Sequence, residues 1–138
     1  MRLTQYTDFG LRALMRLAGT PDRSFTTEEI AQELAISRHH LTKVVRDLAA
    51  RGVLTTRRGA GGGLALARPA SEITLGEVVR HLEARHAIVE CFRADGGACT
   101  LTPRCRLRRR VATAAEAFLA ELDKTTLADC AYPPPRRR

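Results

Sequence analysis

Three cysteines within fifteen residues are the side chains of this sequence with the clearest capacity for chemistry. Cys91, Cys99 and Cys105 stand in CFRADGGACTLTPRCRLRRR, residues 91–110, and Cys130 is the only other cysteine. Disulfide pairing within this segment would leave one thiol over. Three interpretations are therefore open: a shared inorganic ligand, a reactive thiol, or ordinary packing of cysteine side chains.

The spacing of the three thiols favours an inorganic cluster over a single zinc ion. Seven residues separate the first two and five separate the next two, whereas a zinc site usually begins from a Cys-x2–4-Cys pair. The intervening RADGGA is flexible enough to wrap a larger body. Nearby arginines would stabilise thiolates and an anionic cluster, although incidental or redox-active thiols remain an alternative. These arginines are Arg93, Arg104, Arg106 and Arg108.

The composition predicts one domain with a polyanionic partner. The chain has 138 residues, of which 44% are apolar and 28% charged, as in ordinary globular proteins. Its net charge of +8 comes mostly from arginine, whose planar fork suits phosphate oxygens and guanine edges.

The N-terminus predicts a cytoplasmic protein. MRLTQYTDFGLRAL lacks the apolar core and cleavage site of a signal peptide. No stretch approaches the roughly 18 apolar residues of a membrane helix, so no membrane partner is expected. In the reducing cytoplasm, clustered cysteines more often bind metal or act in redox chemistry than form structural disulfides.

Three helices near the N-terminus predict a helix-turn-helix. Apolar residues recur at helical spacing from Thr7 to about Gly19. A second helix opens with the capping pair Thr26 and Glu29. After two intervening residues, the third, residues 37–52, has Ser37 as its N-cap and ends at a glycine.

The third helix has an apolar face and a face of hydrogen-bond donors. Residues 41, 44, 45 and 48 are Leu, Val, Val and Leu, and they must pack inward. The opposite face suits a helix that reads the major groove, although a solvated face is the competing interpretation. The helix-turn-helix residues predicted to contact DNA are Thr27, Ser37, Arg38, His39, His40, Thr42, Lys43 and Arg46.

A β-hairpin after the third helix favours the DNA-binding interpretation. Strand-like runs from Val53 to Arg57 and from Leu64 to Ala67 flank a glycine-rich tip. Arg57 and Arg58 at this tip can reach a minor groove or phosphates, so both join the predicted DNA contacts. The glycines do not form a nucleotide loop, because no Lys-Ser/Thr follows them.

Two further helices complete the prediction. Thr74 and Glu77 cap a fourth helix, and Thr102 and Pro103 are expected as the N-cap and first residue of a long fifth one. An apolar seam on the fifth helix predicts dimerisation, with packing on its own domain as the alternative. The seam residues are Leu107, Val111, Ala114, Phe118 and Leu122.

The predicted fold is mainly α: a winged helix-turn-helix with a small β-hairpin wing and a long C-terminal dimerisation helix. Residues 1–85 form the DNA-binding domain, and residues 86–105 a cysteine-rich cluster-binding loop. Residues 106–129 form the dimerisation helix and end segment, and 130–138 a disordered basic tail. No Cys-x-x-Cys pair, His-Glu-x-x-His helix or nucleophile elbow is present, so an enzyme is not expected.

Four stretches together resemble one family of winged-helix repressors, the family that includes NsrR, IscR and RirA. They are MRLTQYTDFGLRAL, ISRHHLTKVVRDLAARGVL, RGAGGGLALARPASEITLGEVVRHLE and CTLTPRCRL, and the resemblance extends to about Asp129. TDFGLRAL, the pair His39-His40 and the ending FLAELDKTTLADC are most similar to the members that sense nitric oxide. Members that regulate iron-sulfur assembly carry a histidine ligand shortly after the third cysteine, where this chain has Arg106 and Leu107.

The resemblance implies a homodimeric repressor that binds a palindromic operator in double-stranded DNA and responds to nitric oxide. It implies an iron-sulfur cluster, 4Fe-4S in preference to 2Fe-2S, held by Cys91, Cys99 and Cys105. Asp8 of the other subunit is the expected fourth ligand, although an acid in a first helical turn also interacts favourably with the helix dipole. Cys130 is expected to be a spare thiol. A family member that senses iron, cluster or redox status through the same cysteines is the alternative.

Overall fold

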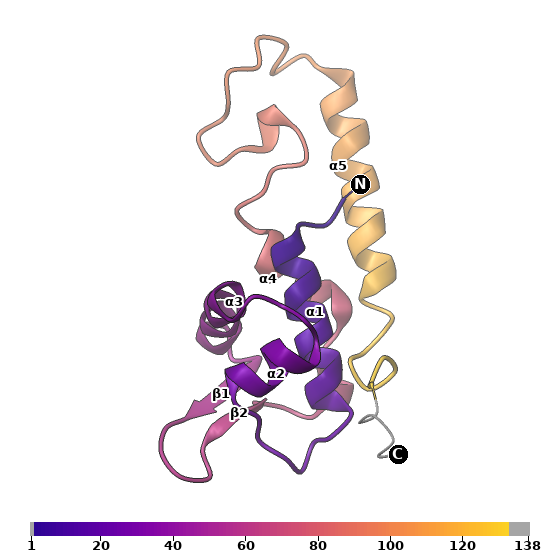
Figure 1. Cartoon of the computed structure of the whole chain (residues 1–138). Helices are drawn as coiled ribbons and strands as arrows, with labels where there is room; N and C mark the ends of the chain where they lie inside the picture. Colours follow the sequence, from indigo (N-terminus) through magenta and orange to yellow (C-terminus); the bar gives the residue numbers. More distant parts are fainter. Residues whose placement is uncertain (1, 133–138) are drawn as a thin grey trace.

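The computed structural model describes residues 2–132, which form a winged-helix body with a long helix rising from it (Figure 1). The part of the predicted basic tail from residue 133 onward lies outside the described residues. No helix within residues 2–132 combines the length and apolarity needed to cross a membrane. The elements are α1 (Gln5–Ala18), α2 (Thr27–Glu33), α3 (Arg38–Ala50), β1 (Leu54–Arg57), β2 (Gly63–Leu66), the 3-10 turn η1 (Ala70–Glu72), α4 (Leu75–Glu83), the 3-10 turn η2 (Glu90–Phe92) and α5 (Arg106–Leu122).

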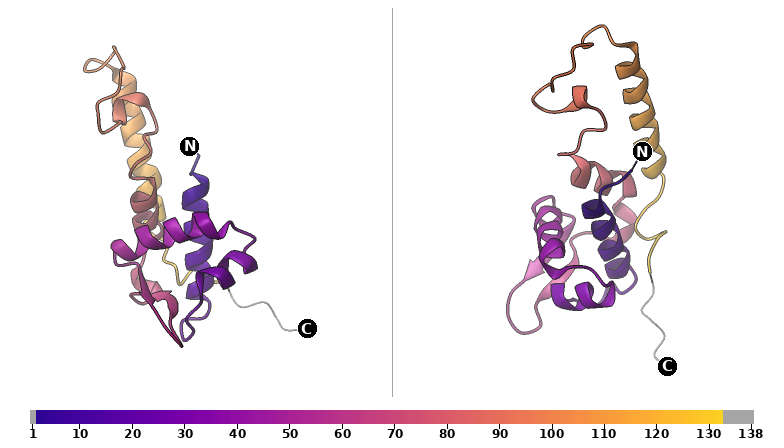
Figure 2. Two further views of the ribbon diagram at one scale, coloured as in Figure 1. Left: turned by 60° about the vertical axis from the view of Figure 1, so that its left-hand side comes forward. Right: turned by 45° about the horizontal axis from the view of Figure 1, so that its top comes forward.

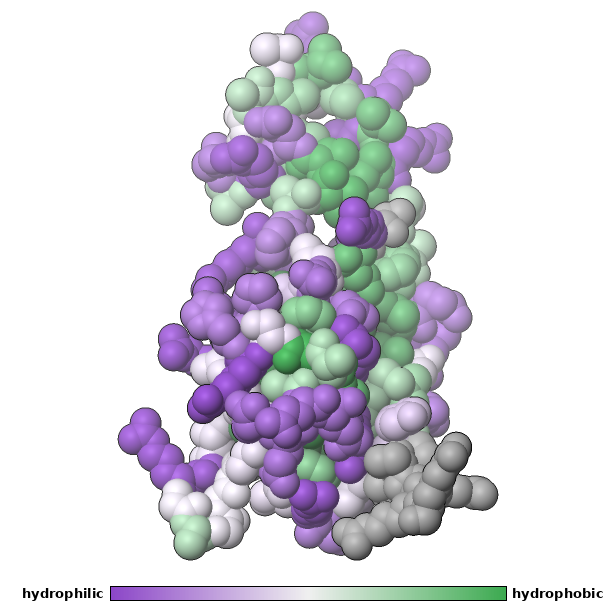
Figure 3. All heavy atoms as spheres, in the orientation of Figure 1, coloured by the Kyte–Doolittle hydropathy of each residue, from purple (hydrophilic) through white to green (hydrophobic). Residues whose placement is uncertain are grey.

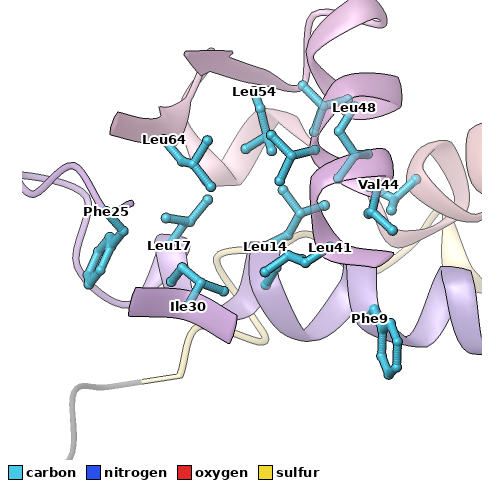
Figure 4. Close-up of a cluster of buried hydrophobic side chains, with 14 of the residues drawn as sticks. Phe9, Leu14, Leu17, Phe25, Ile30, Leu41, Val44, Leu48, Leu54 and Leu64 are labelled. Atoms are coloured by element: carbon cyan, nitrogen blue, oxygen red, sulfur yellow. The ribbon is translucent and has the colours of Figure 1, made fainter. Parts of the chain in front are cut away.

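The core lies where α1, α3 and the hairpin meet (Figure 4). The apolar face predicted for α3 is confirmed, because Leu41, Val44 and Leu48 are fully buried and Val45 is nearly so. Leu14 of α1 is also fully buried. The burial of one complete face fixes the rotation of α3, so its opposite face points to solvent.

A buried arginine holds α2 against α1. The Arg16 side chain is only 3% exposed, and its Nε donates to a carboxylate oxygen of Glu33 at the end of α2. Its Nη1 donates to Thr20 Oγ1 at 2.8 Å, and its guanidinium carbon lies 4.6 Å from the centroid of the Phe25 ring. A buried guanidinium is tolerated only when it is paired and hydrogen-bonded, as Arg16 is here. This cluster sets the position of the helix-turn-helix.

The hairpin is attached to the helix-turn-helix by its second strand. Strands β1 and β2 pair antiparallel, with Leu54 opposite Leu66. Leu64 forms a further bridge with Phe25, with N···O distances of 3.0 and 2.6 Å. Gly63 is required there, since a Cβ atom would lie 2.6 Å from the Phe25 carbonyl oxygen and φ is +147°. The predicted hairpin is thus confirmed: β1 begins one residue later than predicted, and β2 lies one residue earlier at both ends.

The chain returns to the winged-helix body after α5, as the turned views show (Figure 2). Leu127 is fully buried in the core, and its N–H donates to the Ile73 carbonyl at 2.9 Å. Asp123 accepts 2.7 and 2.6 Å hydrogen bonds from Arg80 of α4. The N–H of Tyr132 donates to the Met15 carbonyl of α1 at 2.9 Å. The base of α5 therefore packs on its own chain, whereas no residue of the helix is fully buried.

The predicted start of the long helix was wrong. Thr102 and Pro103 precede the helix, with a cis peptide bond between them, and do not begin it. Cys105 is the N-cap, because its extended backbone (φ −74°, ψ 113°) cannot belong to the helix, which starts at Arg106.

The predicted capping box of α4 is only half present. Thr74 accepts the N–H of Glu77 at 3.1 Å, but the Glu77 carboxylate pairs with Arg68 in the preceding loop. A charge-assisted bond to a guanidinium is stronger than a bond to a backbone N–H, so Arg68 takes the carboxylate. Helix α1 begins two residues earlier than predicted, with Thr4 as its N-cap.

Truncating Leu41 should destabilise the protein far more than truncating an exposed leucine. We expect Leu41→Ala to lower the free energy of unfolding by about 2–5 kcal/mol, because it opens a cavity beneath α3. Urea denaturation measures this change. The matched control Leu101→Ala, at a side chain that is 68% exposed, should cost less than about 0.5 kcal/mol. Equal losses in the two variants would contradict the assignment of α3 to the core.

Candidate DNA interface and cysteine segment

The outward face of α3 carries three donors that no ion pair or side-chain hydrogen bond within residues 2–132 occupies. His39, Lys43 and Arg46 are exposed and stand opposite the buried face of the helix. A row of free donors on one helix face matches the acceptors that guanine and the phosphates present in and beside a major groove.

Other predicted DNA contacts are partly engaged within the protein. Arg38 lies 3.2 Å from a Glu28 carboxylate oxygen, and the Thr42 hydroxyl donates to the Arg38 carbonyl at 2.8 Å. His40 stacks on Phe9 with ring centroids 6.3 Å apart. Ser37 caps the helix by accepting the His40 N–H, and Thr27 is half-buried. Sequence patterns could not separate these residues from the free donors.

The wing places two arginines in solvent beside α3. Arg57 is the last residue of β1 and Arg58 opens the loop that follows, and both are exposed. Neither forms an ion pair in the described part of the chain. Glycines with positive φ at positions 59 and 61 let the loop turn back tightly. The hairpin lies on one side of α3, below it in Figure 1, as a winged helix requires.

A hydrogen bond that the sequence did not reveal links α1 to α3. The Tyr6 hydroxyl donates to Asp47 Oδ2 at 2.7 Å. Burial, reinforced by this bond, raises the pKa of Tyr6 to about 12. Tyr6 therefore remains a donor at neutral pH, and α1 holds the polar edge of α3 as well as its apolar face.

The cysteine segment forms an arm beside the upper half of α5 (Figure 2). Cys91 lies in η2, Cys99 in the following loop and Cys105 at the N-cap of α5, and all three are half-buried free thiols. Glu90 accepts the Ala98 N–H at 3.1 Å and so closes the loop between them. The pKa of Cys99 is lowered because the Leu101 N–H faces its sulfur.

The structure does not gather the four predicted ligands. No three His, Cys, Asp or Glu side chains among residues 2–132 are arranged to hold a metal ion. Asp8 is 55% exposed and its carboxylate lies 2.9 Å from Arg12 of its own chain. The donor set nevertheless fits an iron-sulfur cluster by its chemistry, because such clusters take thiolates and the Leu101 N–H favours the thiolate of Cys99.

Glu83 ties the N-terminus to the end of α4, where the cysteine segment begins. Its Oε1 accepts the Thr4 N–H and the Thr4 hydroxyl, each at 2.8 Å. Burial would raise the pKa of Glu83, but hydrogen bonds from Thr7 and Thr4 outweigh it and hold this pKa below its usual value. The same carboxylate therefore anchors the cap of α1 and the last turn of α4.

The chain matches a family model over residues 3–133, the Rrf2 model, described as an iron-dependent transcriptional regulator. It is 46% identical over 130 residues to the HTH-type transcriptional regulator NsrR of Geobacillus kaustophilus (strain HTA426). That alignment covers 94% of this chain and 88% of the relative.

Solved structures share the fold over nearly the whole chain. The oxidized form of CymR from Staphylococcus aureus superimposes with a TM-score of 0.72 at 26% identity, covering 97% of this chain and 98% of that one. IscR from T. potens gives the same TM-score at 23% identity, covering 94% and 85%. The predicted winged helix-turn-helix is thereby confirmed.

Replacing Glu83 should weaken the protein in a pH-dependent way. A carboxylate with a lowered pKa in the folded state contributes stability that is present above its unfolded pKa, about 4.5, and is lost as pH falls through the folded value. We expect Glu83→Gln to lower the thermal unfolding midpoint at pH 7 and this difference to shrink below about pH 4. Glu72→Gln, at an exposed residue, is the control. If the unfolding midpoints of Glu83→Gln and wild type differ by the same amount at pH 7 and below pH 4, the role of the Glu83 charge is contradicted.

Proposed function

This chain belongs to the Rrf2 family of transcriptional regulators, and from that premise we propose that it is a repressor whose operator affinity is controlled by an iron-sulfur cluster that reacts with nitric oxide. The relatives are transcriptional regulators, and the chain is a regulator and not an enzyme. The observation that carries the proposal is the free donor face of α3 beside the exposed arginines of the wing.

In the proposed complex, α3 and the wing contact different parts of the DNA. The free donors on α3 would lie in a major groove and read base edges, while Arg57 and Arg58 hold the adjacent backbone or minor groove. The positive net charge of the chain adds long-range attraction to the duplex. The stacked and paired residues, such as His40 and Arg38, would position α3 or rearrange on contact.

A homodimer is supported by the apolar surface of the upper part of the molecule. Leu107 of α5 is 67% exposed, Leu101 is 68% exposed and Ile88 is 46% exposed. Hydrophobic residues gather along α5 and beside the cysteine segment in the space-filling view (Figure 3). A second copy would cover the seam of α5 and place the two recognition helices about 34–36 Å apart, one DNA turn, on a palindromic operator.

Cys91, Cys99 and Cys105 are the proposed cluster ligands, with Asp8 of the second subunit as the fourth. When bound, a cluster of this kind supplies iron atoms with which nitric oxide reacts. We favour 4Fe-4S over 2Fe-2S, and we place the protein in the cytoplasm, where its DNA lies and thiols stay reduced. The arm that carries the cysteines contacts α5 through Arg108, whose guanidinium carbon lies 5.6 Å from the centroid of the Phe92 ring.

Helix α1 is the proposed link between the cysteine segment and DNA. The segment begins after α4, whose Glu83 accepts hydrogen bonds from Thr4. Two residues further along the chain, the Tyr6 hydroxyl donates to Asp47 of α3. A rearrangement of the cysteine segment can thus shift α1 and with it α3. Changing operator occupancy from 99:1 to 1:99 requires a bias of about 5.5 kcal/mol, which the two subunits of a dimer would share.

Direct oxidation of the thiols is the second candidate signal. It is favoured by the likeness to CymR in its oxidized form and by the half-exposed thiols of the segment. In that case the same α1 linkage would operate without a cluster. Iron and sulfide analysis of anaerobically purified protein separates the two candidates.

Arg46 and Arg58 should have different effects on DNA affinity. We expect Arg46→Ala to weaken binding to the operator by about 1–3 kcal/mol more than binding to an unrelated duplex, because it removes a hydrogen-bond donor to a base. Arg58→Ala should weaken both duplexes alike. Fluorescence anisotropy with an operator selected from a random duplex library measures both. Arg109→Ala, at an exposed arginine of α5 opposite the seam, is the matched control; equal behaviour of all three variants would contradict the interface.

Each of Cys91→Ser, Cys99→Ser and Cys105→Ser should lose most iron and sulfide and the response of DNA binding to nitric oxide, whereas Cys130→Ser should keep both. Anaerobic purification, elemental analysis and titration with nitric oxide, oxygen and an iron chelator provide the measurements. The sensing proposal is refuted if the purified protein holds no iron, or if nitric oxide leaves its affinity for the operator unchanged.

The same experiment tests Asp8. Asp8→Ala should retain iron but change the absorption spectrum of the loaded protein, since one ligand differs. Arg12→Gln breaks the Asp8–Arg12 pair without removing the carboxylate. An identical spectrum in Asp8→Ala and wild type would exclude Asp8 as a ligand.

A further inference from the structure

A cleft of about 920 Å³ lies beside the recognition helix, at the place where α1, α3 and the end of α4 meet. Its lining includes four permanent cations and one carboxylate. Two of the cations, Lys43 and Arg46, also belong to the outward face of α3. The others are Arg51, at the C-cap of α3, and Arg85, just after α4. The cleft therefore opens onto the same side of the molecule as the proposed DNA-reading face.

The cations of this cleft have no ion-pair partner within residues 2–132. The arginines that brace the fold each meet a carboxylate, as in the pairs of Arg16 with Glu33 and of Arg80 with Asp123. No such pair is formed by Lys43, Arg46, Arg51 or Arg85 in the described part of the chain. Four like charges around one hollow repel one another. An external anion would relieve this repulsion.

The one carboxylate of the lining is already engaged. Asp47 accepts the Tyr6 hydroxyl at 2.7 Å, which ties it to α1. His81 also lines the cleft, and its Nε2 lies 3.8 Å from Glu77 Oε1. The permanently charged donors are a lysine and three arginines, whose forks suit phosphate oxygens. An apolar ligand would gain little here, because it would have to desolvate these charges.

We propose that Arg51 and Arg85 in this cleft bind a backbone phosphate of the operator, while Lys43 and Arg46 reach into the adjacent major groove that α3 occupies. The inference rests on the proposed DNA-binding function and adds Arg51 and Arg85 to its contacts. A helix in the major groove runs between two sugar-phosphate backbones. The wing lies on one side of α3 and the end of α4 on the other (Figure 1). The wing arginines would contact one sugar-phosphate backbone, and the arginines of the cleft would contact the other.

This position also gives the cleft a connection to the cysteine segment. Arg85 stands two residues after Glu83, at the start of the chain that leads to Cys91. A movement of that segment would displace Arg85 relative to Lys43 on α3. The phosphate contact would then depend on the arrangement of the arm, which makes the cleft a point where DNA affinity is adjusted.

The salt dependence of DNA binding tests this proposal. The full-length, anaerobically purified wild type, Arg51→Gln, Arg85→Gln and the double variant are compared on a selected operator and an unrelated duplex, at several salt concentrations. Removing one cation that binds a phosphate should reduce the slope of log K against log salt by about 0.9, for both duplexes. Arg85→Lys, which keeps the charge, should restore most of the slope. Arg109→Gln makes the same charge change on the far side of α5.

The outcomes separate this proposal from the proposed function. If the wild type binds the operator and the cleft variants match Arg109→Gln in slope, the cleft proposal fails while DNA binding stands. If the wild type shows no salt-dependent DNA binding, the proposed function itself fails.

Calorimetry with inorganic phosphate and with AMP tests whether the cleft binds a free phosphate ligand and not the phosphate of DNA. One result would overturn the assignment to operator phosphate: phosphate or AMP binds the wild type, Arg85→Gln abolishes this binding, and the salt slope of DNA binding is the same in both proteins. Circular dichroism checks that every variant is folded.

Discussion

The recognition helix must bury one complete face while leaving the opposite face free of partners, and the rest of the structure serves this constraint. Leu41, Val44 and Leu48 are sealed against α1 and the hairpin. His39 and Lys43 on the other side form no ion pair or side-chain hydrogen bond among the described residues. The burial of the apolar face sets the rotation of α3, and a polar contact at the edge of the helix reinforces it. The bond from Tyr6 to Asp47 makes this contact, because it holds the polar edge of α3 to α1.

Helix α1 and its N-cap are tied to α4, α3 and α2 by three contacts, each to a carboxylate. At its start, Thr4 is held by Glu83 of α4. Two residues later, Tyr6 holds α3. Near its end, buried Arg16 holds α2 through Glu33. Because hydrogen bonds and close packing both have discrete arrangements, a shift of α1 moves the helix-turn-helix as a unit. This helix therefore connects the end of α4, where the cysteine segment begins, to the outward face of α3.

The sequence was a good guide to local structure and a poor guide to contacts between distant residues. Helical periodicity and caps placed α1 to α4, and the glycine-rich tip placed the hairpin. These signals depend on neighbours in the chain. The burial of Leu127, the Tyr6–Asp47 bond and the capture of Glu77 by Arg68 depend on the tertiary fold, and no local pattern encodes them. The start of α5 was misplaced for a related reason: Thr-Pro is a frequent helix opening, but the extended backbone at Cys105 puts the boundary three residues later.

Positive charge at the start of α5 bears on the cysteine segment in a different way from the charge around α3. Arg106 and Arg108 occupy the first turn of the helix, where the helix dipole disfavours cations. Arg104 adds to the same cluster of charge just before it. These side chains repel one another and oppose the dipole, so α5 in isolation gains nothing from them. An anion at Cys105, the N-cap, would offset both effects at once. Electrostatics thus gives the arginine run a reason to lie beside the thiols, which agrees with the anionic cluster proposed for them.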